Sequence, residues 1–377
     1  MKNSSLSYIE LSKSNLIHNF EELKKITKKN VRIAAVIKSN AYGYGQNEVV
    51  KILEPYVDYF QVNSVGELEL LRKVSKQKTF VLGYIQICDL KKAIKLGCIL
   101  SVFSKEQLRN IEKNALELKI KQEIHIPIDA YLGREGILES EWGSFFEEVK
   151  KCKNIKLGGI YAHFANIEDT KNFTHAGKQI KKYKGALNLA EKFGFKKLQT
   201  HISATSGLLV YEKNKGENSI VRLGVGIYGM WPSTYIKYLY KNKLNLKPVM
   251  SWKTKIAQIK TLPSGHSVGY GLTYLTSSLT KIAVIPIGYG DGFDRELSNK
   301  GEVLIGGTRC KVLGRIAMNM FVVDINHLKD VSVEDEVVIL GKQGKEEISA
   351  EEIAEKVGTI NYEVVTRLNP LLPRIIV

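Results

Sequence analysis

The chain has 377 residues, of which 44% are hydrophobic and 25% charged, and its formal net charge is +17. This length exceeds what a single hydrophobic core usually supports, so two domains are expected in a globular protein. No apolar run approaches the ~20 residues of a membrane helix and residues 1–10 hold no apolar signal-peptide core, so we expect a cytoplasmic protein without membrane contact.

The excess of basic residues does not indicate a nucleic-acid partner. The lysines are spread along the chain and mostly lie on polar helix faces such as 22–29 and 178–184. Net charge alone affects solubility and non-specific binding. Four cysteines lack C-x-x-C spacing, namely Cys88, Cys98, Cys152 and Cys310. We therefore expect no disulfide framework and no metal site, as is typical of a reducing compartment.

From residue 14 the chain alternates between helical and strand patterns. Candidate strands begin near Val31, Val57, Thr79, Cys98, Glu123, Leu157, Leu198 and Ile220. The helix after the second strand opens with a capping box, Ser64 to Glu67. Eight such units over roughly 225 residues predict an α/β fold, a (β/α)8 TIM-type barrel at residues 1–237. An open doubly wound sheet is the alternative, although no G-x-G-x-x-G follows the first strand.

Past residue 240 the pattern changes to short strands separated by Gly, Pro and Asp. The expected strands are Val249–Ile259, Thr280–Gly288, Val303–Leu313, Met320–Ile325 and Glu336–Leu340. One helix, Ser349–Lys356, begins with a capping box formed by Ser349 and Glu352 and ends at Gly358. These patterns predict a second, mainly β domain at residues 238–377.

The stretch 31–45, VRIAAVIKSNAYGYG, contains the first candidate for chemistry. Six of its first seven residues are Val, Ile or Ala, which predicts a strand buried on both faces. Lys38 follows at the carboxyl end of this strand, where α/β barrels place their functional residues. Burial lowers the pKa of an amine and leaves a nucleophile that can form a Schiff base. The alternative is a structural lysine that reaches solvent from the strand end.

The string VIKSNAYGYG resembles V-x-K-A-N-A-Y-G-H-G of the alanine racemases, which use pyridoxal phosphate (PLP), and departs from it at Ser39 and Tyr44. Further matches extend the resemblance over nearly the whole chain. It implies that Lys38 holds PLP as a Schiff base and that Tyr42 lies in the cofactor site.

Other motifs at strand ends extend the resemblance within the predicted barrel. The string DAYLGREG resembles D-T-G-M-G-R-L-G and implies that Arg134 contacts the phenolic oxygen of PLP and the substrate carboxylate. A guanidinium suits this role because it stays charged and presents paired donors. The resemblance also implies that His163 supports an arginine at the cofactor and that His201 supports a catalytic tyrosine.

The string VRLGVG resembles V-R-P-G-I and implies contacts with both ends of the cofactor. The amides of Gly224 and Val225 and the hydroxyl of Thr205 would bind the phosphate. Arg222 would face the pyridine nitrogen and, with a pKa above ~12, would donate there without losing its proton. The ring would then be a weaker electron sink, which favours racemisation over transamination.

In the predicted β domain, VGYGLTY resembles V-S-Y-G-x-T-Y and makes Tyr270 the second catalytic base. The remaining matches imply that Met318 contacts the substrate and that Tyr362 contacts the phosphate. They place three further residues at or near the entrance of the site, namely Tyr289, Arg295 and Arg315. The resemblance thus implies an alanine racemase that supplies D-alanine for peptidoglycan. Lys38 would take the proton from D-alanine and Tyr270 from L-alanine, since inversion requires a base on each face. It also implies a head-to-tail homodimer with shared active sites.

Two departures from the family pattern bear on substrate binding. The family often has a carbamylated lysine where this chain has Pro127, so another group, such as bound chloride, must orient Arg134. Asn319 stands where the family has Asp. A serine or broad-specificity racemase is the alternative, because Thr205 and Ala204 also differ from the usual residues. A decarboxylase is disfavoured because Cys310 lacks the corresponding motif, and a non-enzymatic PLP carrier is disfavoured by the second domain.

Overall fold

The computed structural model describes residues 5–212 and 218–377, which form two compact units. The barrel unit comprises Leu16–Ala41 and Val49–Lys247. The β unit comprises the described residues up to Asn15, together with Tyr42–Glu48 and Pro248–Val377.

The barrel unit is built on eight parallel strands in the order β8-β7-β6-β5-β4-β3-β2-β9. They are β2 (Arg32–Val36), β3 (Tyr59–Val62), β4 (Thr79–Val81), β5 (Ile99–Ser101), β6 (Gln122–Pro127), β7 (Ile155–Tyr161), β8 (Gln199–His201) and β9 (Ile220–Leu223). Each begins within two residues of its expected position. The two strands at the ends of this order, β8 and β9, meet where Ser219 N, next to β9, donates to the carbonyl of Thr200 in β8 at 3.0 Å. The (β/α)8 prediction is confirmed.

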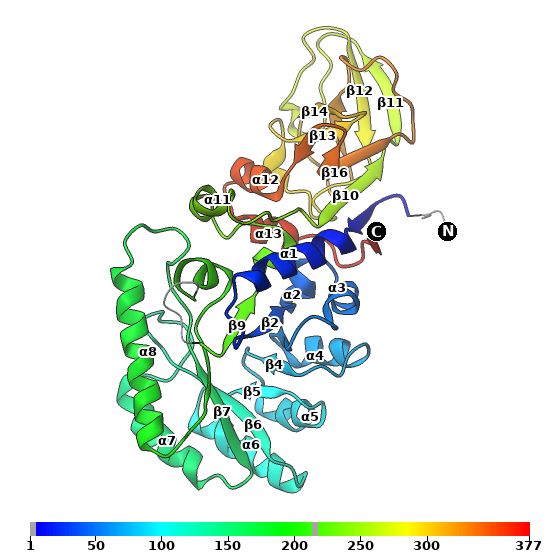
Figure 1. Ribbon diagram of the computed structural model, residues 1–377. Coiled ribbons are helices and arrows are strands. Elements are labelled where there is room, and N and C mark those ends of the chain that lie inside the picture. Colours follow the sequence, from blue (N-terminus) through cyan, green and yellow to red (C-terminus); the bar gives the residue numbers. More distant parts are fainter. Residues whose placement is uncertain (1–4, 213–217) are drawn as a thin grey trace. The chain divides into compact units, whose positions relative to one another are not determined.

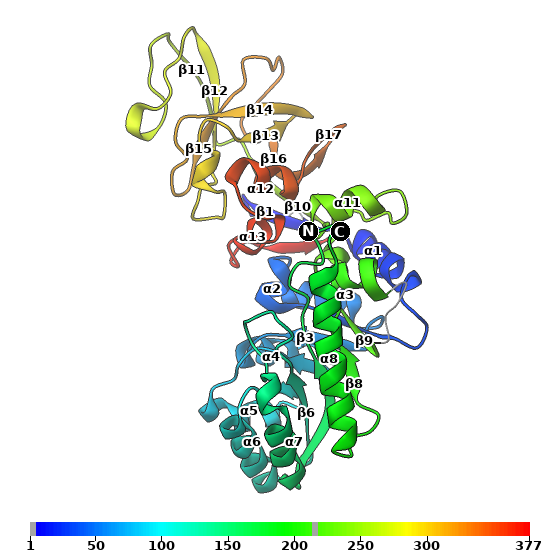
Figure 2. The ribbon, with the colours of Figure 1, turned by 90° about the vertical axis from the view of Figure 1, so that its left-hand side faces the viewer.

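Helices cover the outside of these strands, as Figures 1 and 2 show for α4–α8. The helices are α1 (Lys13–Lys25), α3 (Gln46–Leu53), α4 (Val65–Arg72), α5 (Leu90–Lys95), α6 (Lys105–Glu117), α7 (Trp142–Lys151), α8 (Thr174–Lys192) and α11 (Thr234–Tyr240). Their apolar faces pack inward, as Leu108, Ile111 and Ala115 of α6 illustrate. The Ser64 cap predicted for α4 is present, because its hydroxyl accepts from Glu67 N at 3.2 Å.

The β unit contains a ten-stranded sheet in the order β11-β12-β15-β14-β13-β16-β10-β1-β18, with β17 paired to β16. Its strands are β1 (Tyr8–Leu11), β10 (Met250–Lys255), β11 (Gln258–Leu262), β12 (Thr280–Ile285), β13 (Glu302–Ile305), β14 (Thr308–Leu313), β15 (Phe321–Asp324), β16 (Glu336–Gln343), β17 (Glu346–Ile348) and β18 (Arg374–Ile376). Among the described strands of this sheet, β1 and β18 are the one parallel pair.

Two expected strands of this unit are in fact pairs of strands. The segment 249–259 breaks at Ile256 and Ala257, so it contains the whole of β10 and the start of β11. The segment 303–313 folds into the β13–β14 hairpin, because Gly306 and Gly307 adopt φ of 56° and 73°. Positive φ at both central residues is the geometry of a tight hairpin turn, and glycine adopts it at little cost.

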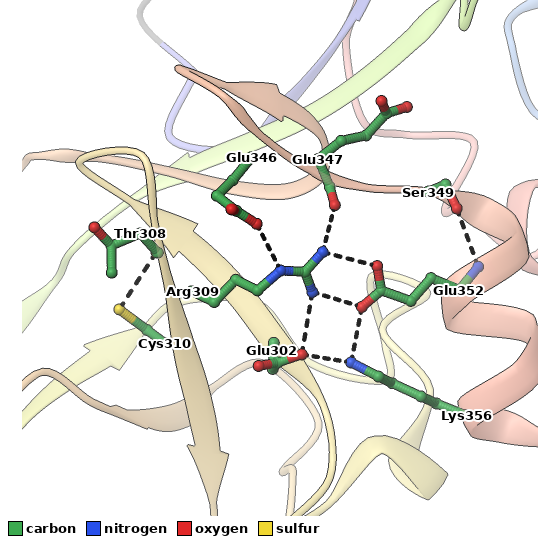
Figure 3. A network of polar contacts seen from close by, with 9 residues as sticks. All are labelled: Glu302, Thr308, Arg309, Cys310, Glu346, Glu347, Ser349, Glu352 and Lys356. Atoms are coloured by element: carbon green, nitrogen blue, oxygen red, sulfur yellow. Dashed lines mark hydrogen bonds and ion pairs between the residues drawn. The ribbon is translucent and has the colours of Figure 1, made fainter.

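The expected helix of the β unit is α12 (Ala350–Val357), capped by Ser349 and ended by Gly358 in the left-handed region. A polar network fastens it to the sheet (Figure 3). Arg309 of β14 donates to both oxygens of Glu352 at 2.7 and 3.0 Å, and Lys356 bridges Glu302 and Glu352 at 2.7 and 2.8 Å. The short helix α13 (Asn361–Thr366) follows, and Asn361 donates to Glu351 of α12 at 2.9 Å.

Candidate active site

Lys38 lies two residues beyond the end of β2, and a left-handed turn begins directly after it. The next four residues, Ser39–Tyr42, have φ between 52° and 56°, and Gly43 has φ 84°. A left-handed turn costs an L-residue about 1–2 kcal/mol, so such turns persist where surrounding structure holds them, often at functional sites. Asparagine favours this region as a single residue, but the string S-N-A-Y did not indicate four left-handed residues in a row, because glycine first appears at position 43.

Glu67 of α4 binds the amide beside Lys38. One carboxylate oxygen accepts from Ser39 N and the other from Asn63 N, both at 2.7 Å. The two amides lie at the ends of neighbouring strands, so one carboxylate joins the β2 and β3 ends. The sequence indicated Glu67 only as part of a capping box, since its long-range partners depend on the barrel closing.

The half-buried amine of Lys38 has a pKa below its ordinary value. Burial is the main cause, and the positive charges of Arg134 and Arg222 add to it. Glu67 and Glu135 act in the opposite direction but do not outweigh these effects. A lowered pKa increases the fraction of neutral amine at neutral pH, which is the nucleophilic form. A lowered pKa is the property that the role expected of Lys38 requires.

Arg222 of β9 is 1% exposed and is surrounded by acceptors. Its Nη1 donates to the carbonyl oxygen of His201 at 2.8 Å, and its Nη2 donates to that of Ala162 at 2.9 Å and to Nδ1 of His163 at 3.0 Å. Burial lowers the pKa of Arg222 to about 10, which still leaves the guanidinium charged at neutral pH. The barrel thus brings together Arg222, His163 and His201.

The contacts of Arg222 determine the tautomers of a buried histidine pair. A guanidinium can only donate, so Nδ1 of His201 accepts from Arg222, and its Nε2 carries the proton toward Nδ1 of His125 at 2.7 Å. Nε2 of His125 then points its proton at Glu123, 3.7 Å away. Burial, with the charge of Arg222, holds the pKa of His201 well below its usual value, so this histidine is neutral. His125 is a site residue that the motifs did not indicate.

Hydrogen bonds to its main chain hold the loop that carries Arg134. The carboxylate of Asp129 accepts from the amides of Leu132 and Gly133 at 3.0 and 3.1 Å. Ile137 N donates to the carbonyl of Pro127 at 2.8 Å and closes the base of the loop. The Arg134 side chain itself is 63% exposed and forms an ion pair with Glu135. Glu135, a leucine in the family motif, was not among the expected site residues.

The expected phosphate-binding residues of the barrel unit also lie together. Gly226 N donates to the Thr205 hydroxyl at 3.4 Å, next to Gly224 and Val225. A Cβ at position 226 would lie 2.7 Å from the Thr205 methyl group, so only glycine permits this approach. Thr205 and Val225 each begin a short helix, α9 (Thr205–Gly207) and η4 (Val225–Tyr228). A hydroxyl beside backbone amides is a donor set that fits a phosphate group.

In the β unit, Tyr42 and Tyr362 have their ring centroids 6.1 Å apart. Burial raises the pKa of Tyr42 to about 12, so its phenol remains protonated. Arg374 donates to the carbonyl of Gly43 at 2.9 Å and fixes the end of the left-handed turn in this unit.

The other expected residues of the β unit lie on exposed loops. Tyr270 is 73% exposed and Met318 57% exposed. A Cβ at Gly271 would lie 2.7 Å from Nη1 of Arg315, so the Tyr270 loop packs against Arg315. The Tyr289 and Met318 loops are joined where Tyr289 N donates to Ala317 O at 3.2 Å. Arg295 and Arg315 line one cleft.

Within residues 5–212 and 218–377, no cluster of three or more His, Cys, Asp or Glu side chains could hold a metal ion. No helix in that part of the chain is long and apolar enough to cross a membrane. The four cysteines are unpaired thiols.

Comparisons with known proteins match both units of the chain. Residues 11–232 match the family model of the alanine racemase N-terminal domain, and residues 249–376 match that of the C-terminal domain. Alanine racemases of Leptospira interrogans and Methanococcus maripaludis are each 35% identical, over 100% and 98% of this chain and 97% and 98% of their own lengths.

Solved structures agree with these sequence matches. An alanine racemase of Clostridium difficile 630 is 32% identical with a TM-score of 0.92, and covers 100% of this chain and 97% of its own. One from Bacillus anthracis with bound L-Ala-P is 30% identical with a TM-score of 0.93, over 100% and 96% of the two chains. Since both domains match over nearly their whole length, this chain belongs to the alanine racemase family.

Proposed function

We propose that the chain is a PLP-dependent alanine racemase that interconverts L-alanine and D-alanine. The observation that supports this most directly is the buried Arg222 within electrostatic range of the lowered-pKa amine of Lys38, in a chain whose residues 11–232 match the N-terminal domain model of the racemases. The matched C-terminal domain model disfavours a PLP carrier without a second domain.

The residues of the chain fit PLP. Lys38 would hold it through its amine, Thr205, Gly224, Val225 and Tyr362 would bind its phosphate, and Arg222 would face its ring nitrogen. Tyr42 and His163 would lie beside it. When bound, PLP supplies an electron sink that acidifies the α-hydrogen of an amino acid.

Arg222 is suited to make the PLP ring a weaker electron sink. Its carbonyl acceptors at 2.8 and 2.9 Å and the neutral imidazoles of His163 and His201 keep the guanidinium charged and oriented. With a pKa of about 10, it can donate a hydrogen bond to a ring nitrogen while retaining its proton. This arrangement favours rapid return of a proton to the α-carbon, as racemisation requires.

Two bases are proposed to exchange the α-proton. Lys38 takes the α-proton from D-alanine and Tyr270 takes it from L-alanine, and the two bases act on opposite faces of the α-carbon. Arg134 binds the substrate carboxylate through its guanidinium, which stays charged at neutral pH, and the backbone of Met318 adds a contact. Tyr289, Arg295 and Arg315 lie at the entrance, with His201 supporting the site from behind Arg222.

A homodimer with shared sites is proposed as the active form. Tyr270, Leu272 and Leu275 are all at least 60% exposed on one loop of the β unit. Large exposed apolar side chains grouped on one segment are typical of interaction surfaces. Covering them with a second copy would place Tyr270 of one chain at the site of the other.

The test follows the circular dichroism of L- and D-alanine, L- and D-serine and L- and D-lysine with the PLP-loaded protein. Racemisation of alanine is expected, and faster turnover of serine would favour the broad-specificity alternative. Borohydride should attach PLP covalently to Lys38, and label on another lysine would contradict the assignment. Tyr270→Phe should abolish racemisation but retain α-proton exchange from D-alanine, whereas the similarly exposed Tyr238→Phe should leave both unchanged.

A further inference from the structure

We propose that Glu135 is a built-in anion that positions the Arg134 guanidinium for the substrate carboxylate, so that this chain needs neither a carbamylated lysine nor bound chloride. The proposal rests on the proposed racemase function. Glu135 acts through Arg134 and is therefore a positioning residue.

The pair has the geometry of a two-point hydrogen bond. Nε of Arg134 donates to one carboxylate oxygen of Glu135, and Nη2 donates to the other at 2.7 Å. Two parallel contacts fix the plane of a guanidinium as well as its distance. They leave Nη1 without an acceptor among residues 5–212 and 218–377, so this group is available to a ligand.

The loop backbone alone cannot orient this side chain. Gln179 of α8 donates to the carbonyls of Ala130 and His163 at 2.8 and 3.0 Å, which anchors the loop to the barrel. Beyond this anchored backbone the arginine side chain is 63% exposed and has many rotamers to lose. Pro127 has no side-chain donor or acceptor with which to restrict them. Glu135, only 24% exposed, is the group that does so.

Glu135 also supplies negative charge where cations gather. Its carboxylate lies 3.7 Å from Nε2 of His163, and both Lys38 and Arg222 are within electrostatic range. Burial opposes its ionisation, but the hydrogen bonds and charge of Arg134 outweigh burial, so its pKa lies below the usual value. Glu135 is thus ionised at neutral pH and offsets part of the effect of Arg134 on Lys38.

The matched control is the pair of Arg109 and Glu148. Nε of Arg109 donates to Glu148 at 2.7 Å, with exposed fractions of 64% and 18%, close to the 63% and 24% of the Arg134 pair. This control lies on α6 and α7, away from the residues of the site. Glu148→Gln therefore removes an equivalent ion pair without touching the site.

The first experiment compares Glu135→Gln and Glu148→Gln in steady-state racemisation after thorough degassing. We expect Glu135→Gln to raise the KM for L-alanine about fivefold with a smaller change in kcat, because a largely exposed pair is worth little more than ~1 kcal/mol. Formate should restore part of the affinity of Glu135→Ala, and the wild type should respond to neither bicarbonate nor chloride. An unchanged or lower KM in Glu135→Gln, or a wild type that requires either anion, would overturn the proposal.

The second experiment needs no racemase activity. In the cofactor-free protein, the rate at which trinitrobenzenesulfonate modifies Lys38 is measured against pH by peptide mass. Because Glu135 raises the pKa of Lys38, Glu135→Gln should shift this profile to lower pH, and Glu148→Gln should not. An unshifted profile would refute the placement of Glu135, whatever the activity. A shifted profile in a protein that does not racemise alanine would instead refute the proposed function.

Discussion

The left-handed turn after Lys38 predicts a specific effect of Glu67→Gln. The side chain of glutamine has nearly the shape of glutamate but only one acceptor oxygen. One of the two amides now bound at 2.7 Å, Ser39 N or Asn63 N, would therefore face an NH2 group instead of an oxygen. The turn would lose the charged group that holds it beside Lys38.

The expected magnitude follows from these two contacts. Hydrogen bonds to charged groups contribute about 1.5–3 kcal/mol each. Ser39 and Asn63 are exposed, so water can partly replace the lost acceptor and the lower end of this range applies. A local loss of about 1.5 kcal/mol corresponds to roughly tenfold more frequent opening of the turn. Since Ser39–Tyr42 are held against a cost of about 1–2 kcal/mol per residue, opening should release the whole turn.

Hydrogen exchange of the cofactor-free protein measures this directly. The peptide spanning 36–46 should exchange about tenfold faster in Glu67→Gln, while peptides from β6 and β7 keep their rates. Glu69→Gln is the control, because Glu69 lies on the same helix and, among residues 5–212 and 218–377, pairs only with Lys92, at 2.8 Å. If the two variants exchange alike in this peptide, Glu67 does not hold the turn and the reasoning fails.

Three further predictions concern Arg222, Glu123 and the dimer. Arg222→Lys has three donors for the five acceptors of Arg222, so it leaves at least two of them without a donor and should lower the free energy of unfolding by about 3 kcal/mol, measured in urea without cofactor. His125 and the Lys156 amine, 2.9 Å away, hold the pKa of Glu123 at about 2. The stabilisation this provides is complete above the unfolded pKa of ~4.3 and is lost as pH falls toward 2, so Glu123→Gln should flatten the acid unfolding profile by about 1–2 kcal/mol. Mixing inactive Lys38→Ala and Tyr270→Phe chains should regenerate activity in hybrid dimers, and no recovery after verified subunit exchange would place both bases in one chain.

The barrel could be predicted from the sequence because its strands are buried on both faces. Apolar runs such as 33–37, separated by helical patterns, indicate a parallel strand without any knowledge of its neighbours. The edges of the β unit offer no such signal. Strands β1 and β18 have three or four residues each and become strands only by pairing with each other and with β10. The strand pattern also continues through Ile256 and Ala257, so it predicted one strand where the structure has β10 and β11.

The site could be predicted where a motif carries the chemistry in its own residues, as at Lys38 and Arg222. Glu67, His125 and Glu135 were missed because their roles depend on partners that folding brings close. His125 meets His201 from a separate strand, and nothing in the spacing of 76 residues signals that contact. Glu135 follows Arg134 immediately, and adjacent opposite charges are common on surfaces, so the sequence did not distinguish an oriented pair from a solvated one.

The position of β1 has a consequence for how the chain folds during synthesis. Ile9 and Leu11 are made first, yet they pair with Arg374 and Ile376, which the ribosome adds at ~5–20 residues per second, roughly 20–70 s later. Every strand of the barrel lies between Arg32 and Leu223, so the barrel can close before β10 and β18, the partners of β1, have been made. Contacts of such long sequence separation are slow to form. The sheet of the β unit is therefore completed only when translation reaches β18, after every strand of the barrel has been made.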